Sequence, residues 1–284
     1  MGPMPVSPCR IVITDIDGTL LADDGSLPGI NRDALAHCRT LGVRTCLATG
    51  RRWTTCRRLL DRLDLHGLVD FCILNNGMLV KDVAKDVTLF RRDFRMDLLL
   101  AVAERFNAAG LEAIALGHHP DGTGTDVFHR REALLNGDFV LKNAGHARRV
   151  EAWEELAEEH LVELVLIGAR ADLEAARALV AGLPVETAIL RNTYYAEYML
   201  EITPKGVSKL LGADELLGHL GLDRGHALAI GDSDNDLALL AGIPRSAAVA
   251  NADAGAKAAA REITGSNAEG GFAQAVLRHV RPHP

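Results

Sequence analysis

Short, mainly apolar runs recur near both ends of this 284-residue chain, and a helical pattern follows most of them. Such runs have the length of buried strands, whereas apolar residues spaced three and four apart indicate amphipathic helices. We take five runs as strands of one sheet, at residues 11–13, 43–48, 69–74, 227–230 and 247–250. Alternation of strands and helices at this spacing is typical of a parallel sheet with helices packed against it. The pattern therefore predicts an α/β fold.

The rhythm changes between about residue 78 and residue 203. There the pattern predicts a hairpin at 78–80 and 87–90, helices at 96–109, 148–160 and 171–181, and strands at 111–116, 161–167, 185–190 and 197–202. A segment of this length with apolar surfaces of its own suggests a separate domain. We therefore expect a Rossmann-like core from residues 1–80 and 203–284, with an inserted α+β cap domain at 81–202.

Polar and small residues stand directly after each of the five predicted core strands. They are Asp15 and Asp17 after the first strand, Thr49 and Gly50 after the second, Asn75 and Asn76 after the third, Asp232, Asn235 and Asp236 after the fourth, and Asn251 after the fifth. In open parallel sheets ligands bind beyond the carboxyl ends of the strands. The repetition predicts one site at this edge of the sheet.

The residue types at this edge point to a metal ion and a phosphate group. Asp15 and Asp17 are two residues apart on an extended chain and so point the same way, where they repel each other unless a cation or proton lies between them. Mg²⁺ is the preferred ion because it takes one or two carboxylates together with substrate phosphate. Asp232 would complete the carboxylate set for the ion, and Asp236 would lie nearby, either behind the ligands or as an occasional ligand itself. The simpler alternative is an acidic turn that caps the next helix.

Each remaining group then has a possible role. Asp15 could accept a phosphoryl group as nucleophile, and Asp17 could act as general acid and base. Thr49 offers a hydroxyl group and Gly50 an unobstructed backbone N–H to phosphate oxygens. A lysine is also expected as a point charge against the phosphoryl group. The candidates are Lys205 and Lys209, near the start of the helix before the fourth strand.

Four segments in this order resemble the four motifs of the haloacid dehalogenase-like (HAD) phosphohydrolases. They are DIDGT at 15–19, ATG at 48–50, the lysine of PKGVSK at 204–209, and GDSDND at 231–236. The chain is similar, more narrowly, to the Cof-type branch, which carries a large α/β cap between the second and third motifs. NNG at 75–77, EITPKGVSK at 201–209 and VANA at 249–252 are the strings that resemble this branch.

The resemblance implies that Asp15 is the nucleophile, that Asp17 is the general acid and base, and that Asp15, the backbone carbonyl of Asp17, and Asp232 hold Mg²⁺. It aligns the family lysine with Lys209, and leaves Lys205 as the second choice. The next residue, usually glycine in the family, is Leu210 here. The resemblance also implies that Thr49 and Asn235 contact phosphate or order the metal ligands.

Several charged residues could contact the rest of the substrate or could simply lie at the surface. Arg51 and Arg52 begin the helix after the second strand, and we include Arg51 among the substrate-binding candidates. Arg130 and Arg131 could bind an acidic group or solubilise the cap. His118 and His119 stand in a glycine-rich loop, where a structural role is the simpler interpretation.

Composition narrows the class of protein further. The net charge of −7 gives no general attraction to nucleic acid or anionic membranes, and no apolar run approaches the roughly 20 residues of a membrane helix. The five cysteines contain no CxxC pair, which favours reduced thiols in a cytoplasmic protein over disulfides or zinc. The sequence leaves the oligomeric state open between monomer and dimer.

The resulting hypothesis is a Mg²⁺-dependent phosphatase that hydrolyses a small phosphorylated metabolite, similar to a sugar phosphate, through an aspartyl-phosphate intermediate. The nearest alternative is a phosphomutase resembling phosphomannomutase, which would return the phosphoryl group to the sugar. Phosphatases specialised for sucrose phosphate or mannosyl-phosphoglycerate carry similar motifs. The alternative from another class is a regulatory protein with an idle site.

Overall fold

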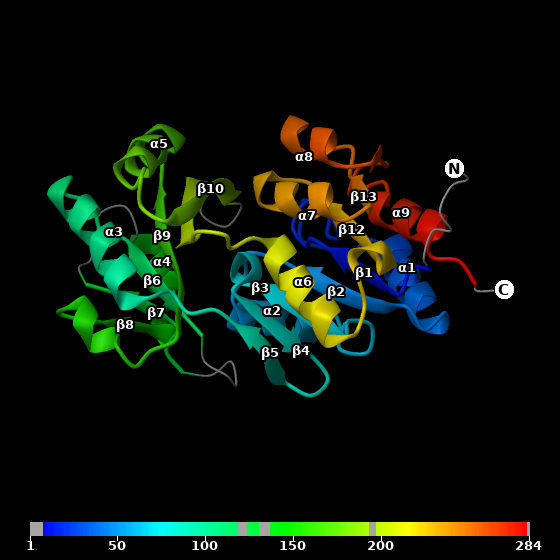
Figure 1. The fold of residues 1–284 in the computed structure, drawn as a ribbon, viewed down its shortest axis with the longest axis horizontal. Coiled ribbons are helices and arrows are strands. Elements are labelled where there is room, and N and C mark those ends of the chain that lie inside the picture. Colours follow the sequence, from blue (N-terminus) through cyan, green and yellow to red (C-terminus); the bar gives the residue numbers. More distant parts are fainter. Residues whose placement is uncertain (1–7, 119–123, 131–136, 193–196, 283–284) are drawn as a thin grey trace. The chain divides into compact units, whose positions relative to one another are not determined.

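The computed structural model describes residues 8–118, 124–130, 137–192 and 197–282. The chain divides into two compact units, and each has its own sheet (Figure 1). The first unit contains the residues up to Arg91 together with those from Ser208 onward, and the second contains Arg92–Val207. The second unit is therefore inserted into the sequence of the first.

An eight-stranded sheet forms the centre of the first unit, in the order β14-β13-β12-β1-β2-β3-β4-β5. The six strands from β14 to β3 run parallel, whereas β4 and β5 are antiparallel. The strand bounds are β1 Ile11–Thr14, β2 Arg44–Ala48, β3 Phe71–Leu74, β4 Leu79–Asp82, β5 Val87–Arg91, β12 Ala227–Gly231, β13 Arg245–Ala248 and β14 Glu262–Ile263.

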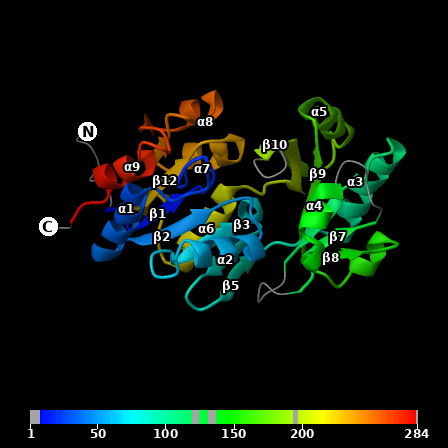
Figure 2. The ribbon, with the colours of Figure 1, turned by 180° about the vertical axis from the view of Figure 1, so that it is seen from behind.

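Helices pack against both faces of this sheet. They are α1 Gly29–Thr40, α2 Trp53–Arg62, α6 Lys209–His219, α7 Leu237–Gly242, α8 Ala254–Ala259 and α9 Gly271–His279. Helices α6 and α7 lie on the face seen in Figure 1, and α1 and α2 lie on the face seen from behind in Figure 2. The predicted α/β class with a parallel core sheet is confirmed.

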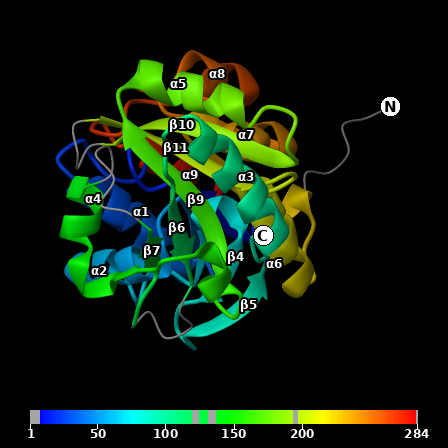
Figure 3. The ribbon, with the colours of Figure 1, turned by 90° about the vertical axis from the view of Figure 1, so that its left-hand side faces the viewer.

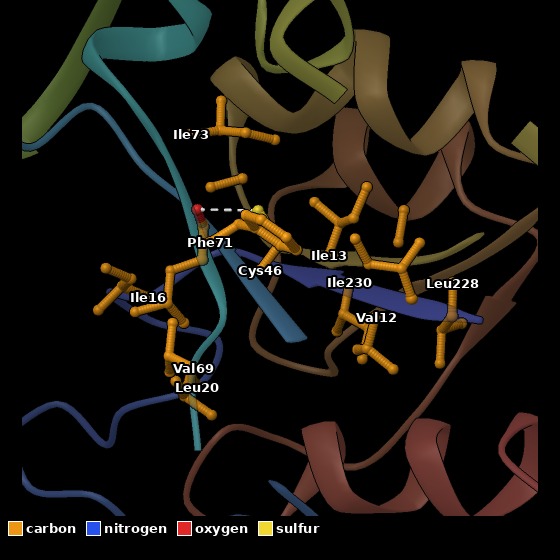
Figure 4. Close-up of a cluster of buried hydrophobic side chains, with 14 of the residues drawn as sticks. Val12, Ile13, Ile16, Leu20, Cys46, Val69, Phe71, Ile73, Leu228 and Ile230 are labelled. Atoms are coloured by element: carbon orange, nitrogen blue, oxygen red, sulfur yellow. Dashed lines mark hydrogen bonds between the residues drawn. The ribbon is translucent and has the colours of Figure 1, made fainter. Parts of the chain in front are cut away.

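The middle of this sheet is buried on both faces, which explains why its strands read as short continuous apolar runs. All four residues of β1 are buried. Side chains of β1, β3 and β12 meet in one apolar cluster that includes Val12, Phe71 and Leu228 (Figure 4). In register, Thr14 lies beside Leu47 of β2 and Ile230 of β12, so these three strands end at nearly the same level. The residues that follow them begin at one edge of the sheet.

The second unit is built on a six-stranded sheet in the order β10-β11-β9-β6-β7-β8. Its strands are β6 Ile114–Gly117, β7 Val127–His129, β8 Ala147–Arg149, β9 Leu161–Gly168, β10 Val185–Asn192 and β11 Glu197–Pro204, and its helices are α3 Met96–Ala108, α4 Gly137–Lys142 and α5 Arg170–Leu179. Helices α3 and α5 lie along β9 (Figure 3), where an apolar cluster joins them to the sheet.

Two details differ from the sequence-based prediction. The hairpin of β4 and β5 extends the first sheet, so residues 81–91 pack with the first unit, although we had placed them in the inserted segment. The predicted helix at 148–160 is wrong. Residues Ala147–Arg149 instead pair with β7, and only Trp153–Leu156 form a short 3-10 helix. Strand pairing overrides the helical pattern there, and the Glu155 carboxylate accepts hydrogen bonds from the backbone N–H groups of Glu151 and Ala152.

No helix within the described part of the chain is long and apolar enough to cross a membrane.

Candidate functional site

Asp15 lies at the end of β1 and contacts the first residue of α6. Its backbone N–H continues the sheet by donating to the Ile230 carbonyl at 2.9 Å. Its Oδ1 accepts a hydrogen bond from Lys209 Nζ at 2.6 Å, and the Lys209 side chain is completely buried. The helix begins at Lys209 because the Ser208 side chain caps it by accepting from the Leu211 N–H. Residues far apart in the sequence thus form a buried ion pair.

Asp236 holds the other side of Lys209 and also shapes the loop after β12. Its Oδ1 accepts from Lys209 Nζ at 2.8 Å, and its Oδ2 accepts from the backbone N–H groups of Asp232 and Ser233 at 3.0 and 3.2 Å. Both carboxylate oxygens are therefore engaged by the protein. Gly231 leaves the necessary room, since a Cβ there would lie 2.5 Å from Asp236 Cγ.

Asp232 lies between the loop after β12 and the loop after β1. The Thr19 hydroxyl donates to Asp232 Oδ1 at 2.7 Å. The close approach depends on Gly18, which has φ +82° and where a Cβ would lie 2.6 Å from Asp232 Oδ2. A side chain at residue 18 would meet the carboxylate and would also strain the backbone. The glycine of the DIDGT string is thus required by this contact.

The acidic side chains of this cluster perturb one another. Burial raises the pKa of Asp15 well above its usual range, and the carboxylates of Asp236, Asp232 and Asp17 raise it further, although the Lys209 ammonium group opposes them. Burial and Asp236 raise the pKa of Asp232 to about 7, against the hydrogen bond from Thr19. Burial alone would lower the pKa of Lys209, but Asp15 and Asp236 hold it above its ordinary value. The cluster therefore carries excess negative charge.

This charge and geometry fit a divalent cation. Asp15, Asp232 and Asp236 each offer a carboxylate oxygen, and these oxygens lie within 4.8 Å of one another. With all groups ionised, three carboxylates and one ammonium group leave a formal charge of −2. Hard oxygen ligands suit Mg²⁺ or Ca²⁺, and a divalent ion would relieve the repulsion that raises the carboxyl pKa values.

Asp17 stands apart from this buried group. Its side chain is half-exposed and makes a two-point contact with Arg51, with Nε to Oδ2 at 2.7 Å and Nη2 to Oδ1 at 2.6 Å. Such paired hydrogen bonds give an arginine and a carboxylate a defined mutual geometry. The structure therefore places Arg51 beside the expected general acid, which the sequence did not indicate.

The loop after β2 and the turn after β3 complete this edge. Thr49 is buried, and its Oγ1 accepts from the Arg51 N–H at 3.1 Å, while the adjacent Gly50 is half-buried. Asn235 donates from Nδ2 to Asn76 Oδ1 at 3.0 Å. All these residues belong to the first unit, together with Asp15, Asp17, Lys209, Asp232 and Asp236.

The remaining candidates lie in the second unit. Lys205 is exposed, and its carbonyl accepts from Arg92 Nη2 at 3.4 Å. His118 is buried and its backbone N–H donates to the His160 carbonyl at 2.8 Å. Arg130 donates from Nε to the Glu151 carbonyl at 3.2 Å, and the same Nε lies 3.7 Å from an oxygen of Glu112. His119 and Arg131 lie outside the described residues.

Sequence reasoning assigned no role to Thr19 or to the side chain of Asn76. Thr19 contacts Asp232, and Asn76 contacts Asn235. Thr19 stands two residues after Asp17, and Asn76 is itself one of the polar residues at a predicted strand end, which was the available signal. The partner of each is distant in sequence, so only the folded chain shows the contact.

Comparisons with known proteins identify the family of the chain. A family model described as haloacid dehalogenase-like hydrolase matches residues 12–276. The chain is 26% identical over 273 residues to the 5-amino-6-(5-phospho-D-ribitylamino)uracil phosphatase YitU of Bacillus subtilis, covering 93% of this chain and 95% of that protein. It is 26% identical over 247 residues to the HMP-PP phosphatase of Yersinia pseudotuberculosis, covering 86% and 84%.

Among solved structures, the HAD subclass IIB sugar phosphatase BT4131 has a TM-score of 0.76, at 22% identity, and the match covers 95% of this chain and 98% of that one. At this identity the likeness shows a shared fold.

Proposed function

This chain belongs to the haloacid dehalogenase-like hydrolase family, and from that premise we propose that it is a Mg²⁺-dependent phosphatase of a small phosphorylated metabolite. The observation that carries the proposal is the buried cluster of Asp15, Lys209, Asp232 and Asp236 at the carboxyl edge of the parallel sheet. A carboxylate at a strand end beside a fixed ammonium group is suited to attack phosphorus.

In the first proposed step a carboxylate oxygen of Asp15 attacks phosphorus. The bond between phosphorus and the substrate oxygen breaks, and that oxygen leaves as an alcohol with a proton from Asp17. Lys209 stays between Asp15 and Asp236 and faces the phosphoryl charge, so no reorganisation of the ammonium group is needed at the moment of reaction. Because Lys209 already contacts Asp15 in this way, we assign it the role of the phosphate lysine in preference to Lys205.

In the second step water replaces Asp15 on phosphorus. Asp17 takes a proton from the water molecule, whose oxygen forms the new bond, and the bond to the Asp15 oxygen breaks to release inorganic phosphate. Both oxygens of Asp17 are held by Arg51 in the structure. Arg51 must therefore release Asp17 during turnover, and its guanidinium group would then contact the substrate.

Mg²⁺ would be held by the carboxylates of Asp15 and Asp232, with the backbone carbonyl of Asp17, and would supply charge neutralisation for the phosphoryl oxygens when bound. Asp236 contributes to the charge that attracts the ion. Its two oxygens already hold Lys209 and the backbone of Asp232 and Ser233, so its main role is to position these groups. Thr49, Gly50 and Asn235 would contact phosphate oxygens.

The names of similar proteins indicate a substrate class. The relatives are named for a phosphorylated ribityl compound, for HMP-PP and for sugar phosphates, all of them small phosphorylated molecules. We propose that the substrate of this chain belongs to the same broad class, with a hydroxyl-rich leaving group such as that of a sugar phosphate.

The direct test measures phosphate release from a panel of sugar phosphates, nucleotides and phosphorylated acids, with Mg²⁺ and with a chelator. Asp15→Asn removes the nucleophile while keeping its shape and should lower turnover by at least about 10⁴-fold. Asp33→Asn, an equal change on the exposed face of α1, is the matched control and should match the wild type.

Mg²⁺-dependent release that Asp15→Asn loses and Asp33→Asn keeps would support the proposal. Phosphate release by Asp15→Asn at the wild-type rate would show that Asp15 is not the nucleophile. Isomerised sugar phosphate in place of free phosphate, dependent on a bisphosphate activator, would identify the phosphomutase alternative.

A further inference from the structure

The turn that follows β3 adopts a costly backbone conformation. Asn75, Asn76 and Gly77 have φ values of +45°, +54° and +104°, so three successive residues lie in the left-handed region. Asparagine tolerates this region better than most residues, but non-glycine residues there still carry strain. Both asparagines are buried, at 1% and 7% exposure. Strain of this kind persists only where the surroundings impose it, and it concentrates at functional sites.

One side of the turn is bonded to the loop that follows β2. The Asn75 N–H donates to the Arg51 carbonyl at 3.2 Å, and the Asn76 N–H donates to the Thr49 carbonyl at 3.1 Å. The backbone of the turn therefore fixes the peptide group between Thr49 and Gly50 and the peptide group between Arg51 and Arg52. The first of these carries the Gly50 N–H that we assign to the phosphate.

The other side of the turn touches the start of α6. A Cβ on Gly77 would lie 2.0 Å from the carbonyl oxygen of Ser208, and a Cβ on Gly212 would lie 3.1 Å from the Gly77 Cα. The two backbones can approach this closely only because both positions are glycine. Ser208 directly precedes Lys209, so the turn supports the helical start that carries the buried ammonium group.

The Asn76 side chain reaches a third segment. Its Oδ1 accepts from Asn235 Nδ2 at 3.0 Å, and Asn235 Oδ1 accepts in turn from the Ser233 hydroxyl at 3.0 Å. These two contacts fix which end of the Asn235 amide faces which neighbour. The loop between Asp232 and Asp236 is thereby tied to the turn after β3.

We propose that the turn at residues 75–77 is a positioning device for phosphoryl transfer, with Asn76 acting through Asn235 and Gly77 acting through the start of α6. The turn contacts all three segments that carry the proposed phosphate-binding groups: Thr49 with Gly50, Lys209, and Asn235. It aligns these groups in the ground state, so that little rearrangement remains when the phosphoryl group transfers. This inference rests on the proposed function.

The test compares two single variants with two control variants. Asn76→Gly keeps the left-handed backbone and removes the amide, and Gly77→Ala introduces the Cβ that would meet Ser208. Asp64→Ala and Gly42→Ala are the controls, because Asp64 is exposed with φ +48° and Gly42 has φ +66° with no atom near its missing Cβ. Each is measured for kcat, KM, thermal unfolding and inhibition by orthovanadate, which resembles phosphate at the transition state.

Asn76→Gly should lower kcat and weaken orthovanadate inhibition by about ten- to a hundred-fold, with KM and melting temperature near those of the wild type. Gly77→Ala should lower kcat and orthovanadate inhibition further than Asn76→Gly does. Asp64→Ala and Gly42→Ala should change the melting temperature but neither kcat nor inhibition. The double variant Asn76→Gly/Asn235→Ala should be no slower than Asn235→Ala, because both changes break one contact.

Wild-type kcat and orthovanadate inhibition in Asn76→Gly would overturn the inference, and so would additive losses in the double variant. If Gly77→Ala does not fold, the Asn76 variants decide. If the wild type binds orthovanadate but releases no phosphate from any substrate, the proposed function fails, and the orthovanadate affinities of the variants still decide the positioning role. A wild-type protein that neither binds orthovanadate nor releases phosphate would contradict both the proposed function and the positioning role.

Discussion

The parallel part of the first sheet and the second sheet hold their buried acidic residues in different places. In the parallel part of the first sheet the buried acidic groups follow the strands, as Asp15 follows β1 and Asp236 follows β12. In the second unit Glu163 and Glu201 lie within β9 and β11 and are 1% and 2% exposed. They alternate with residues of the apolar cluster, such as Leu164, and so occupy the opposite face of the sheet.

This difference indicates which unit carries the phosphoryl-transfer chemistry. Groups beyond the ends of parallel strands converge at one edge, where they can surround a phosphoryl group. Glu163 and Glu201 lie within their strands, so these two carboxylates do not form a comparable cluster at a strand end. We therefore expect the first unit to carry the chemistry. Five predictions test this difference, in order of decreasing expected effect.

The largest effect should come from Lys209→Met. It removes the ammonium group that Asp15 and Asp236 share, and it should lower kcat by about 10² to 10³-fold. It should also destabilise the metal-free protein by about 3–5 kcal/mol, because two carboxylates are left buried without their cation. Lys205→Met, an equal change at an exposed lysine of the second unit, is the control. Phosphate release measures kcat and urea unfolding measures stability. Similar losses of kcat and stability in Lys209→Met and Lys205→Met would contradict the assignment of Lys209.

The second effect is a pH dependence of metal binding. In the metal-free protein the pKa of Asp232 is raised to about 7, and Mg²⁺ binds the ionised carboxylate. Between pH 7 and pH 5 the ion must displace a proton, so its affinity should fall by up to about ten-fold for each pH unit. Calorimetric titration with Mg²⁺ measures this dependence. An affinity that does not change with pH would contradict it.

Stability without metal should follow the opposite trend. A carboxyl group whose pKa is raised by folding stabilises the protein fully below its unfolded pKa, and this contribution disappears as the pH rises through the folded value. In chelator, the melting temperature of the wild type should therefore fall relative to that of Asp232→Asn as the pH rises from 5 to 8. If the melting temperature of the wild type instead rises relative to that of Asp232→Asn over this pH range, burial does not raise the pKa of Asp232.

Thr19→Val should have a smaller effect, confined to the metal. The change keeps the side-chain shape but removes the hydroxyl that donates to Asp232 Oδ1. Loss of such a supporting hydrogen bond should lower Mg²⁺ affinity by about ten-fold or somewhat more. Thr45→Val removes a buried hydroxyl that bonds the Leu68 carbonyl, and it should leave Mg²⁺ affinity unchanged. Equal Mg²⁺ affinities in Thr19→Val and Thr45→Val would show that the Thr19 hydroxyl does not support the metal site.

The smallest effect on chemistry should come from Glu201→Gln in the second unit. The kcat for para-nitrophenyl phosphate, whose leaving group makes few specific contacts, should stay within about two-fold of the wild type. A uniform fall of kcat on every substrate would mean that the second unit takes part in the chemistry.

Much of the first unit could be predicted from the sequence. Its strands are buried on both faces and end in polar residues, so the apolar runs and the residues after them predicted both the α/β class and the group around Asp15 and Asp232. The family resemblance is confirmed by the match over residues 12–276. The site roles themselves stay predictions.

The rest depended on contacts between distant residues. The residue types alone leave both Lys205 and Lys209 open, and the family resemblance favours Lys209. The cap at Ser208 and the burial of Lys209 then distinguish the two in the structure. The contact between Asn76 and Asn235 joins residues 159 positions apart. The residues expected as a helix at 148–160 contain many glutamates, but pairing with β7 determined the conformation at Ala147–Arg149.

The central claim is that Asp15 carries the phosphoryl group during turnover. The most direct measurement quenches the wild-type enzyme with acid during turnover of its best substrate and locates the phosphoryl group by peptide mass spectrometry. The account predicts one phosphoryl group on Asp15, sensitive to hydroxylamine, and none in Asp15→Asn. A phosphoryl group on another residue, or turnover by Asp15→Asn at the wild-type rate, would contradict it.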